Sequence, residues 1–315
     1  MRVVRLINWS LLNTVTLSLV LGSGLPALAQ TSSRSANVED VKLETKDGVK
    51  LAATFFPSSL GKEAVPIVML HDDQESRAVF NALARELQNP EGQELQSHAV
   101  LTVDLRGHGE STTQVGRNGR TRKLEASRLK STDYQNMVRF DMEAVRRFLR
   151  KKNDAEQLNL NKLCLLGSGM GANVAAAYAA YDWSVPPLAR TKQGQDVKAL
   201  ILASPKRNFG GLAIMKALKH PAIRQRISFL IVYGTQDSAA AKDTKNIYKL
   251  LSKYHKMPPP DQRREKQDLF IFPMPTSLKG TRLLTDPNFS MLPKLDIFLY
   301  NRLSQQDFEW TKRIP

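Results

Sequence analysis

LCLLGSGMGANVA, at residues 163–175, is the segment on which the prediction of the fold depends. Residues 163–166 form a short apolar run, as is typical of a strand buried on both faces. Three glycines follow at alternate positions, Gly167, Gly169 and Gly171, and small residues come after them. The segment therefore predicts a buried strand that turns sharply, through glycine, into a closely packed helix.

Apolar runs of the same kind alternate with helical patterns along most of the chain. Buried strands are predicted at residues 65–70, 99–103, 197–203, 227–233 and 269–272. Between them, apolar residues recur at three- and four-residue steps, most clearly from Tyr134 to Leu149. Strands that alternate with helices predict an α/β fold, a mostly parallel sheet flanked by helices.

Two segments in the N-terminal half of the chain predict structures other than a buried strand or an amphipathic helix. Asp47-Gly48 lies between strand-like runs at 41–44 and 49–56, which predicts a hairpin. The basic segment 114–130 lacks apolar periodicity, so we expect a surface loop there. Cys164 is the only cysteine, so no disulfide can form within the chain.

The N-terminus has the features of a secretory signal. Arg2 and Arg5 precede a mostly apolar stretch, and Ala27-Leu28-Ala29 fits the small-x-small cleavage pattern. Residues 1–29 are therefore predicted to be a signal peptide that directs export, to the periplasm or out of the cell. A membrane anchor is the alternative, but the apolar stretch is short and interrupted for a spanning helix. We expect a disordered mature N-terminus at 30–40, one domain at 41–305 and a C-terminal tail at 306–315.

The chain is strongly basic, with a formal net charge of +16 over 315 residues. Such a charge can attract anionic partners, although a solvated basic surface is the simpler explanation. The cations concentrate at 117–130 and 146–152, where no nucleic-acid-binding motif or interleaved aromatic residue accompanies them. We therefore expect no nucleic-acid partner, but an unknown small molecule or an anionic envelope surface.

Three motifs follow three of the predicted strands in a consistent order. The octapeptide at 104–111 reads DLRGHGES, the turn at 167–171 reads GSGMG, and residues 234–237 read GTQD. With these motifs, the chain from about 41 to 303 resembles the α/β-hydrolase fold family, in particular its serine aminopeptidase and lysophospholipase-type members. The resemblance implies an α/β-hydrolase fold with little or no cap, and a nucleophile elbow at 167–171.

The resemblance also implies positions for a catalytic triad, and the chain departs from the pattern at two of them. Gly169 stands where the elbow has its nucleophile, and glycine has no side chain that can attack a substrate. Lys279 stands where the family has its catalytic histidine, in the loop after the last strand. Asp237 matches the triad acid, and without a histidine we expect it to pair with Lys279.

Other residues were considered for the missing roles. Ser168 is the alternative nucleophile, but a motif centred on it would put Leu166 and Met170 where close-packing glycines belong. Lys279 could act as a base if burial lowered its pKa, but it would still need a nucleophile to activate. In the turn at 104–111 we expect a structural role for His108 and an ion pair between Asp104 and Arg106.

The oxyanion hole is predicted from the N–H groups of Asp73 and Met170. Family members commonly have His-Gly after the third strand, whereas this chain has His71-Asp72-Asp73. Two carboxylates there would repel a developing oxyanion. These three residues could ligate a metal, but neighbours at a strand end point in opposite directions, so we expect a solvated loop.

These departures predict a hydrolase-like pseudoenzyme that binds rather than cleaves, with no catalytic residues, no cofactor and no metal. The alternative is an active serine-hydrolase-type esterase or peptidase that uses Ser168 or an unrecognised group. The sequence leaves open which of the two is correct.

Overall fold

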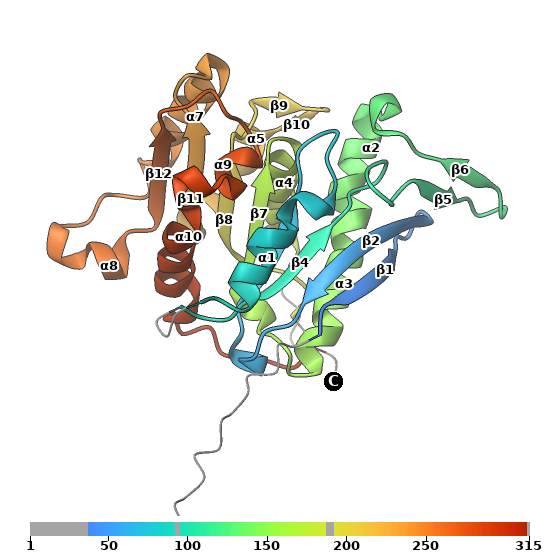
Figure 1. The fold of residues 1–315 in the computed structure, drawn as a ribbon, viewed down its shortest axis with the longest axis horizontal. Helices are drawn as coiled ribbons and strands as arrows, with labels where there is room; N and C mark the ends of the chain where they lie inside the picture. The colour runs from blue at the N-terminus through green and yellow to red at the C-terminus, as the bar shows by residue number, and fades with distance from the viewer. Residues whose placement is uncertain (1–36, 92–94, 187–191, 314–315) are drawn as a thin grey trace, which may run out of the picture. The chain divides into compact units, whose positions relative to one another are not determined.

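The computed structural model describes residues 37–91, 95–186 and 192–313. The predicted signal peptide, residues 1–29, lies outside the described residues. Strands and helices alternate through the described part of the chain (Figure 1). None of the helices in this part is both long and apolar enough to span a membrane.

Ten strands of the described residues form one sheet, in the order β12-β11-β8-β7-β3-β4-β2-β5-β6, with β1 paired to β2. Parallel pairing joins β3 (Pro66–Leu70), β4 (Ala99–Val103), β7 (Leu163–Ser168), β8 (Val197–Ala203), β11 (Ser228–Gly234) and β12 (Leu269–Met274). Antiparallel pairing adds β1 (Glu39–Glu44), β2 (Val49–Phe56), β5 (Thr113–Val115) and β6 (Thr121–Lys123). The predicted mostly parallel sheet and the predicted hairpin at 41–56 are confirmed.

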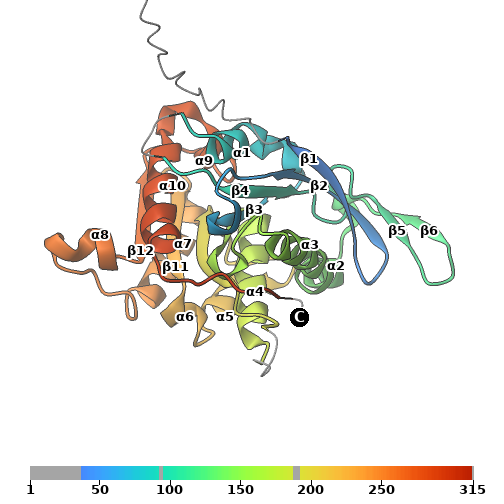
Figure 2. The same ribbon diagram turned by 90° about the horizontal axis from the view of Figure 1, so that it is seen from below.

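Helices cover both faces of this sheet (Figure 2). One face carries α1 (Asn81–Gln88), α9 (Arg282–Thr285) and α10 (Met291–Leu299). The other face carries α2 (Ser131–Asn136), α3 (Met142–Asp154), α4 (Met170–Ser184), α5 (Ile214–Leu218), α6 (Ile223–Arg226) and α7 (Ser238–Leu251). A single π-helical turn, Met137–Asp141, joins α2 to α3, and α8 (Arg263–Lys266) precedes β12.

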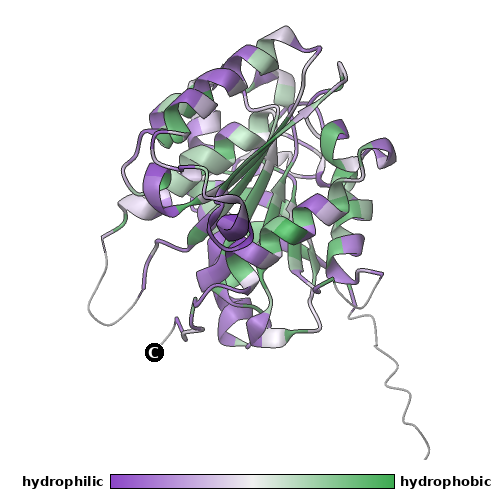
Figure 3. Cartoon of the chain, turned by 90° about the vertical axis from the view of Figure 1, so that its left-hand side faces the viewer, coloured by the Kyte–Doolittle hydropathy of each residue, from purple (hydrophilic) through white to green (hydrophobic). Residues whose placement is uncertain are grey.

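Alternation along the strands divides the apolar core between the two faces. In β3, Val68 and Leu70 join the cluster under α3 and α4, whereas Ile67 and Met69 join the cluster under α1 and α10. The central parallel strands are therefore apolar on both faces, and Figure 3 shows them mostly hydrophobic beside outer helices that mix hydrophilic and hydrophobic residues. Between β8 and β11 the chain forms only short elements: α5, α6 and the hairpin of β9 (Asn208–Phe209) and β10 (Leu212–Ala213).

The surface loop predicted at 114–130 is wrong in its first part. β5 and β6 form a hairpin that continues the sheet from β2 and projects beyond its edge (Figures 1 and 2). Backbone pairing forms this hairpin, while the side chains of β6 are exposed on both faces. No apolar alternation was therefore present in the sequence to reveal it.

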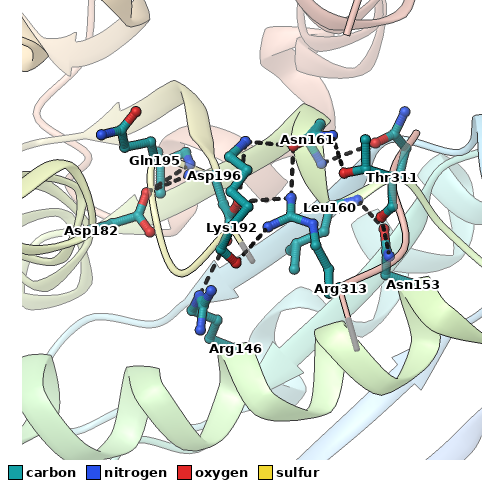
Figure 4. A network of polar contacts seen from close by, with 12 residues as sticks. Arg146, Asn153, Leu160, Asn161, Asp182, Lys192, Gln195, Asp196, Thr311 and Arg313 are labelled. Carbon is teal, nitrogen blue, oxygen red and sulfur yellow. Dashed lines mark hydrogen bonds and ion pairs between the residues drawn. The ribbon is translucent and has the colours of Figure 1, made fainter. Parts of the chain in front are cut away.

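The domain is also longer at both ends than 41–305. β1 begins at Glu39, so part of the stretch predicted as disordered at 30–40 belongs to the sheet. At the other end, segment 306–313 is bound to the domain by buried polar contacts (Figure 4). The buried Arg313 guanidinium pairs with Asp196 at 2.8 Å and donates to Asn161 Oδ1 at 2.7 Å. Asp196 also pairs with Arg146, at 3.1 Å.

Candidate functional site

The turn between β7 and α4 has the shape predicted for an elbow. Gly169 lies between the two elements with φ 48° and ψ −109°, a conformation that favours glycine. A Cβ atom on Gly171 would lie 2.2 Å from Leu70 O, and one on Gly167 would lie 2.4 Å from Gly171 O. The flanking glycines therefore let α4 pack against the turn and the end of β3.

The space beside Gly169 is filled by a side chain from another loop. A Cβ atom on Gly169 would lie 2.0 Å from Cγ, Oδ1 and Oδ2 of Asp72, which follows β3. Such a distance is far shorter than any ordinary contact of a Cβ atom. The carboxylate of Asp72 therefore lies where the side chain of an elbow residue would project.

The two N–H groups predicted to form the oxyanion hole both donate to one oxygen of Asp72. Met170 N and Asp73 N each lie 2.7 Å from Asp72 Oδ1. Lys206 Nζ is a third donor to the same oxygen, at 3.1 Å. Backbone donors at a helix N-terminus together with a cation favour a negative oxygen. The two predicted donors thus converge on one point, where a carboxylate of the protein itself accepts from both.

The loop that carries Asp72 is held through its backbone as well. Asp72 N donates to Glu75 Oε2 at 3.0 Å, and the ring of His71 donates from Nδ1 to Asp72 O at 2.7 Å. Leu105 N donates to Nε2 of the same ring at 3.2 Å, which assigns the proton to Nδ1. Burial lowers the pKa of His71 to about 4, so the ring is neutral at pH 7. The expectation of a solvated loop is therefore wrong, because only 18% of the Asp72 side chain is exposed.

The predicted ion pair between Asp237 and Lys279 is confirmed, with Lys279 Nζ 3.3 Å from Asp237 Oδ2. The other oxygen of Asp237 caps α7 by accepting from Ala239 N at 3.1 Å and Ala240 N at 3.3 Å. The Lys279 side chain is 65% exposed, so it lacks the burial that a lysine base requires. A Cβ atom on Gly280 would lie 2.9 Å from Asp72 Oδ2, so the loop that carries Lys279 passes next to Asp72.

Ser168, the alternative nucleophile, lies below the elbow. It is fully buried, and its hydroxyl is 2.6 Å from Thr281 Oγ1. Thr281 in turn donates to Glu75 Oε2 at 2.5 Å. Within the described residues, no histidine forms a hydrogen bond with Ser168. The hydroxyl therefore joins β7 to the loops after β3 and β12, and no general base contacts it.

The expected pair of Asp104 and Arg106 is not formed. Arg106 pairs with Asp141 at 2.5 Å and with Asp47 at 2.7 Å. Asp104 instead accepts from the backbone N–H of Arg77 at 2.6 Å and pairs with its guanidinium. The prediction is wrong because Asp104 and Arg106 are both buried, and tertiary packing brings each of them an oppositely charged partner from another element.

His71, Asp72 and Asp73 do not converge as metal ligands. The ring of His71 donates to the backbone oxygen of Asp72. The carboxylate of Asp72 accepts from Met170 N and Lys206 Nζ. Asp73 Oδ1 lies 3.3 Å from Nε2 of the structural His108. Across the part of the chain that the structure describes, no three such side chains gather at a point where they could hold a metal ion.

Comparisons with known proteins agree with this geometry at the level of the fold. A family model described as the alpha/beta hydrolase fold matches residues 66–269. No curated protein matches the sequence. Among solved structures, an esterase from Pyrococcus furiosus is similar at 16% identity and a TM-score of 0.56, over 85% of this chain and 91% of that one.

Two further structures show the same likeness. An acylaminoacyl peptidase from Pyrococcus horikoshii is 12% identical with a TM-score of 0.56, over 87% of this chain and 43% of that one. An alpha/beta hydrolase from a Penicillium species is 17% identical with a TM-score of 0.52, over 85% of this chain and 99% of that one. At such identities the likeness concerns the fold alone.

Proposed function

The chain belongs to the α/β-hydrolase fold family, and we propose that it is an exported, non-catalytic member that acts by binding. One observation carries the proposal: the carboxylate of Asp72 occupies the space beside Gly169 and accepts from both predicted oxyanion donors. Hydrolysis on this fold needs a nucleophile at the elbow and free donors for the substrate oxygen. The elbow supplies no nucleophile, and its donors already have an acceptor.

Electrostatics also opposes acyl transfer at this place. A substrate oxygen would have to displace the Asp72 carboxylate from Met170 N and Asp73 N. The displaced carboxylate would stay close by, and two negative charges 4 Å apart repel by about 4 kcal/mol at an effective dielectric constant of 20. That repulsion is as large as the whole stabilisation, about 3–4 kcal/mol, that one oxyanion donor typically supplies. Asp72 is therefore a second obstacle to acyl transfer, beside the absence of a nucleophile at residue 169.

The remaining charged groups at the site are paired with each other. Lys206 neutralises Asp72, and Lys279 neutralises Asp237. Neither lysine has an activated nucleophile beside it, and Ser168 is buried and bonded to Thr281. These contacts favour the non-catalytic proposal over an active esterase or peptidase that uses Ser168. The export part of the proposal rests on the pattern of residues 1–29.

Active-site labelling tests the proposal directly. The purified mature protein is incubated with a fluorophosphonate probe beside an active serine hydrolase, and ester hydrolysis is followed with a chromogenic acyl ester. We expect neither labelling nor turnover above a heat-denatured control. Strong labelling that disappears in Ser168→Ala would overturn the proposal. Mass spectrometry of the protein from the cell envelope, with Gln30 at the mature N-terminus, would support export.

A further inference from the structure

A groove of about 390 Å³ lies between α5 and α7, and no residue of the elbow turn lines it. Its wall on α7 runs from Asp243 to Leu250, about 10 Å along the helix at 1.5 Å per residue, and Lys253 continues it beyond the helix end. A volume of this size is within the range of small-molecule sites. The groove is therefore large enough to hold part of an elongated small ligand.

The floor of the groove is apolar. Ile214 and Ile247 are each 1% exposed, and Met215 and Leu250 are partly buried against the same core cluster. An alkyl chain laid along these side chains would remove apolar surface from water on both partners. Hydrophobic burial thus favours an apolar ligand segment at the base of the groove.

The rim of the groove is cationic. Arg207, Lys249 and Lys253 line it, and among the described residues no acidic side chain pairs with any of the three. Lys249 and Lys253 are four residues apart, a spacing at which like charges repel each other. Asp243 is the acid of the lining and accepts from Arg207 N at 2.8 Å, at the opposite end. An anionic group is therefore favoured at the end with the two lysines.

From these features we propose that the groove binds the monomer of a single-chain amphiphile with one anionic head group, such as an alkanoate or an alkyl phosphate. The head group lies between Lys249 and Lys253, and the chain runs along Met215 and Leu250. A monomer fits better than a bilayer surface, because the apolar side chains line a concave floor that a flat surface would not reach. The groove and the elbow share no residue, so the proposal holds whether or not the elbow is catalytic.

Calorimetric titration with monomeric alkanoates, below their micelle concentration, tests the proposal. We expect decanoate to bind more tightly than octanoate and octanoate more tightly than hexanoate, by up to about fourfold for each methylene that is buried. Decyl phosphate is expected to bind as well, and decyltrimethylammonium is not. Equal binding of the cationic amphiphile, or an affinity that does not change with chain length, would overturn the proposal.

Variants on the exposed rim locate the site. Lys249→Gln and Lys253→Gln are each expected to lower the affinity for decanoate about tenfold, because each removes a charged donor to the head group. Met215→Gln should weaken the dependence on chain length. Lys62→Gln is the charge-matched control, because it removes an exposed lysine that lies before β3 and does not line the groove. This variant should bind decanoate as the parent does. Unchanged affinity in both rim variants, or binding to anionic vesicles without binding to monomers, would refute the site.

Discussion

A Cβ atom on Gly169 would lie 2.0 Å from both carboxylate oxygens of Asp72, so a side chain at residue 169 and this carboxylate compete for one space. Each residue accounts for the other. Gly169 leaves room for the carboxylate, and the carboxylate gives an acceptor to the N–H of Met170, which lies 98 positions away in the chain. We therefore expect substitutions at the two positions to be strongly coupled.

Gly169→Ala is expected to destabilise the protein by about 2–4 kcal/mol, since it expels Asp72 from its donors and places a Cβ at positive φ. In an Asp72→Gly background the same change should lower the unfolding free energy by only about 1–2 kcal/mol, the cost of a Cβ atom at positive φ. Urea unfolding of the four proteins in a double-mutant cycle measures the difference. Equal costs in the two backgrounds would show that the residues do not compete.

Asp72→Ala leaves Met170 N and Asp73 N without their acceptor, and we expect a loss of about 1–3 kcal/mol in unfolding free energy. A small carboxylate can enter the vacated hole, and binding to the folded state alone raises stability. Acetate should therefore raise the melting temperature of Asp72→Ala, with chloride at equal ionic strength as the control. A rise of the same size in the parent protein would contradict this assignment.

Restoring hydrolase chemistry should require three changes. Gly169→Ser with Lys279→His supplies a nucleophile and a base within reach of Asp237, but Asp72 still fills the hole. We expect fluorophosphonate labelling only when Asp72→Gly is added, because this change frees the space and both N–H donors. Labelling by the double variant as strong as by the triple would contradict the blocking role of Asp72. Adding Asp237→Ala to the triple variant should weaken the labelling again.

His71 makes stability depend on pH. Burial lowers its pKa to about 4, against about 6.5 in an unfolded chain, so between these values only the unfolded state binds the proton. Stability from this group is therefore full above pH 6.5 and falls as the pH drops towards 4, by up to about 1.4 kcal/mol per pH unit.

Asp182 has the opposite effect, because burial raises its pKa to about 6. Below pH 6 the folded state binds this proton more readily than the unfolded state, so the contribution of Asp182 to stability rises as the pH falls. The test is therefore a difference between two proteins. From pH 6 to pH 5, the unfolding free energy of the parent should fall by about 1 kcal/mol more than that of His71→Asn. Parallel curves in urea unfolding would rule out this contribution of His71.

Arg313→Ala removes a fully buried guanidinium from Asp196, which is itself fully buried. Breaking a buried ion pair on one side typically costs about 3–5 kcal/mol, and we expect about 3 because Arg146 still contacts Asp196. The neighbouring exposed Lys312→Ala should change stability by less than about 0.5 kcal/mol. Thermal unfolding compares the two, and similar small effects would mean that the C-terminal segment is not part of the folded unit.

Local patterns were enough to predict most of the architecture. The apolar runs at 163–166 and 197–203 and the alternating glycines at 167–171 report strands and a tight turn directly, because each depends on neighbouring residues. The β5–β6 hairpin was missed because its exposed side chains leave no apolar pattern. The partners of Arg106 were missed because Asp47 and Asp141 come to it from other elements.

The identities of two residues, Gly169 and Lys279, predict from the sequence alone that the usual nucleophile and histidine are missing. What fills the vacated space could not be derived in the same way. Asp72 reaches it only because β3 and β7 lie side by side in the sheet, which brings the ends of two distant strands together. The sequence predicts which side chain is absent from the elbow, whereas close packing in the tertiary structure determines which other side chain fills that space and accepts its hydrogen bonds.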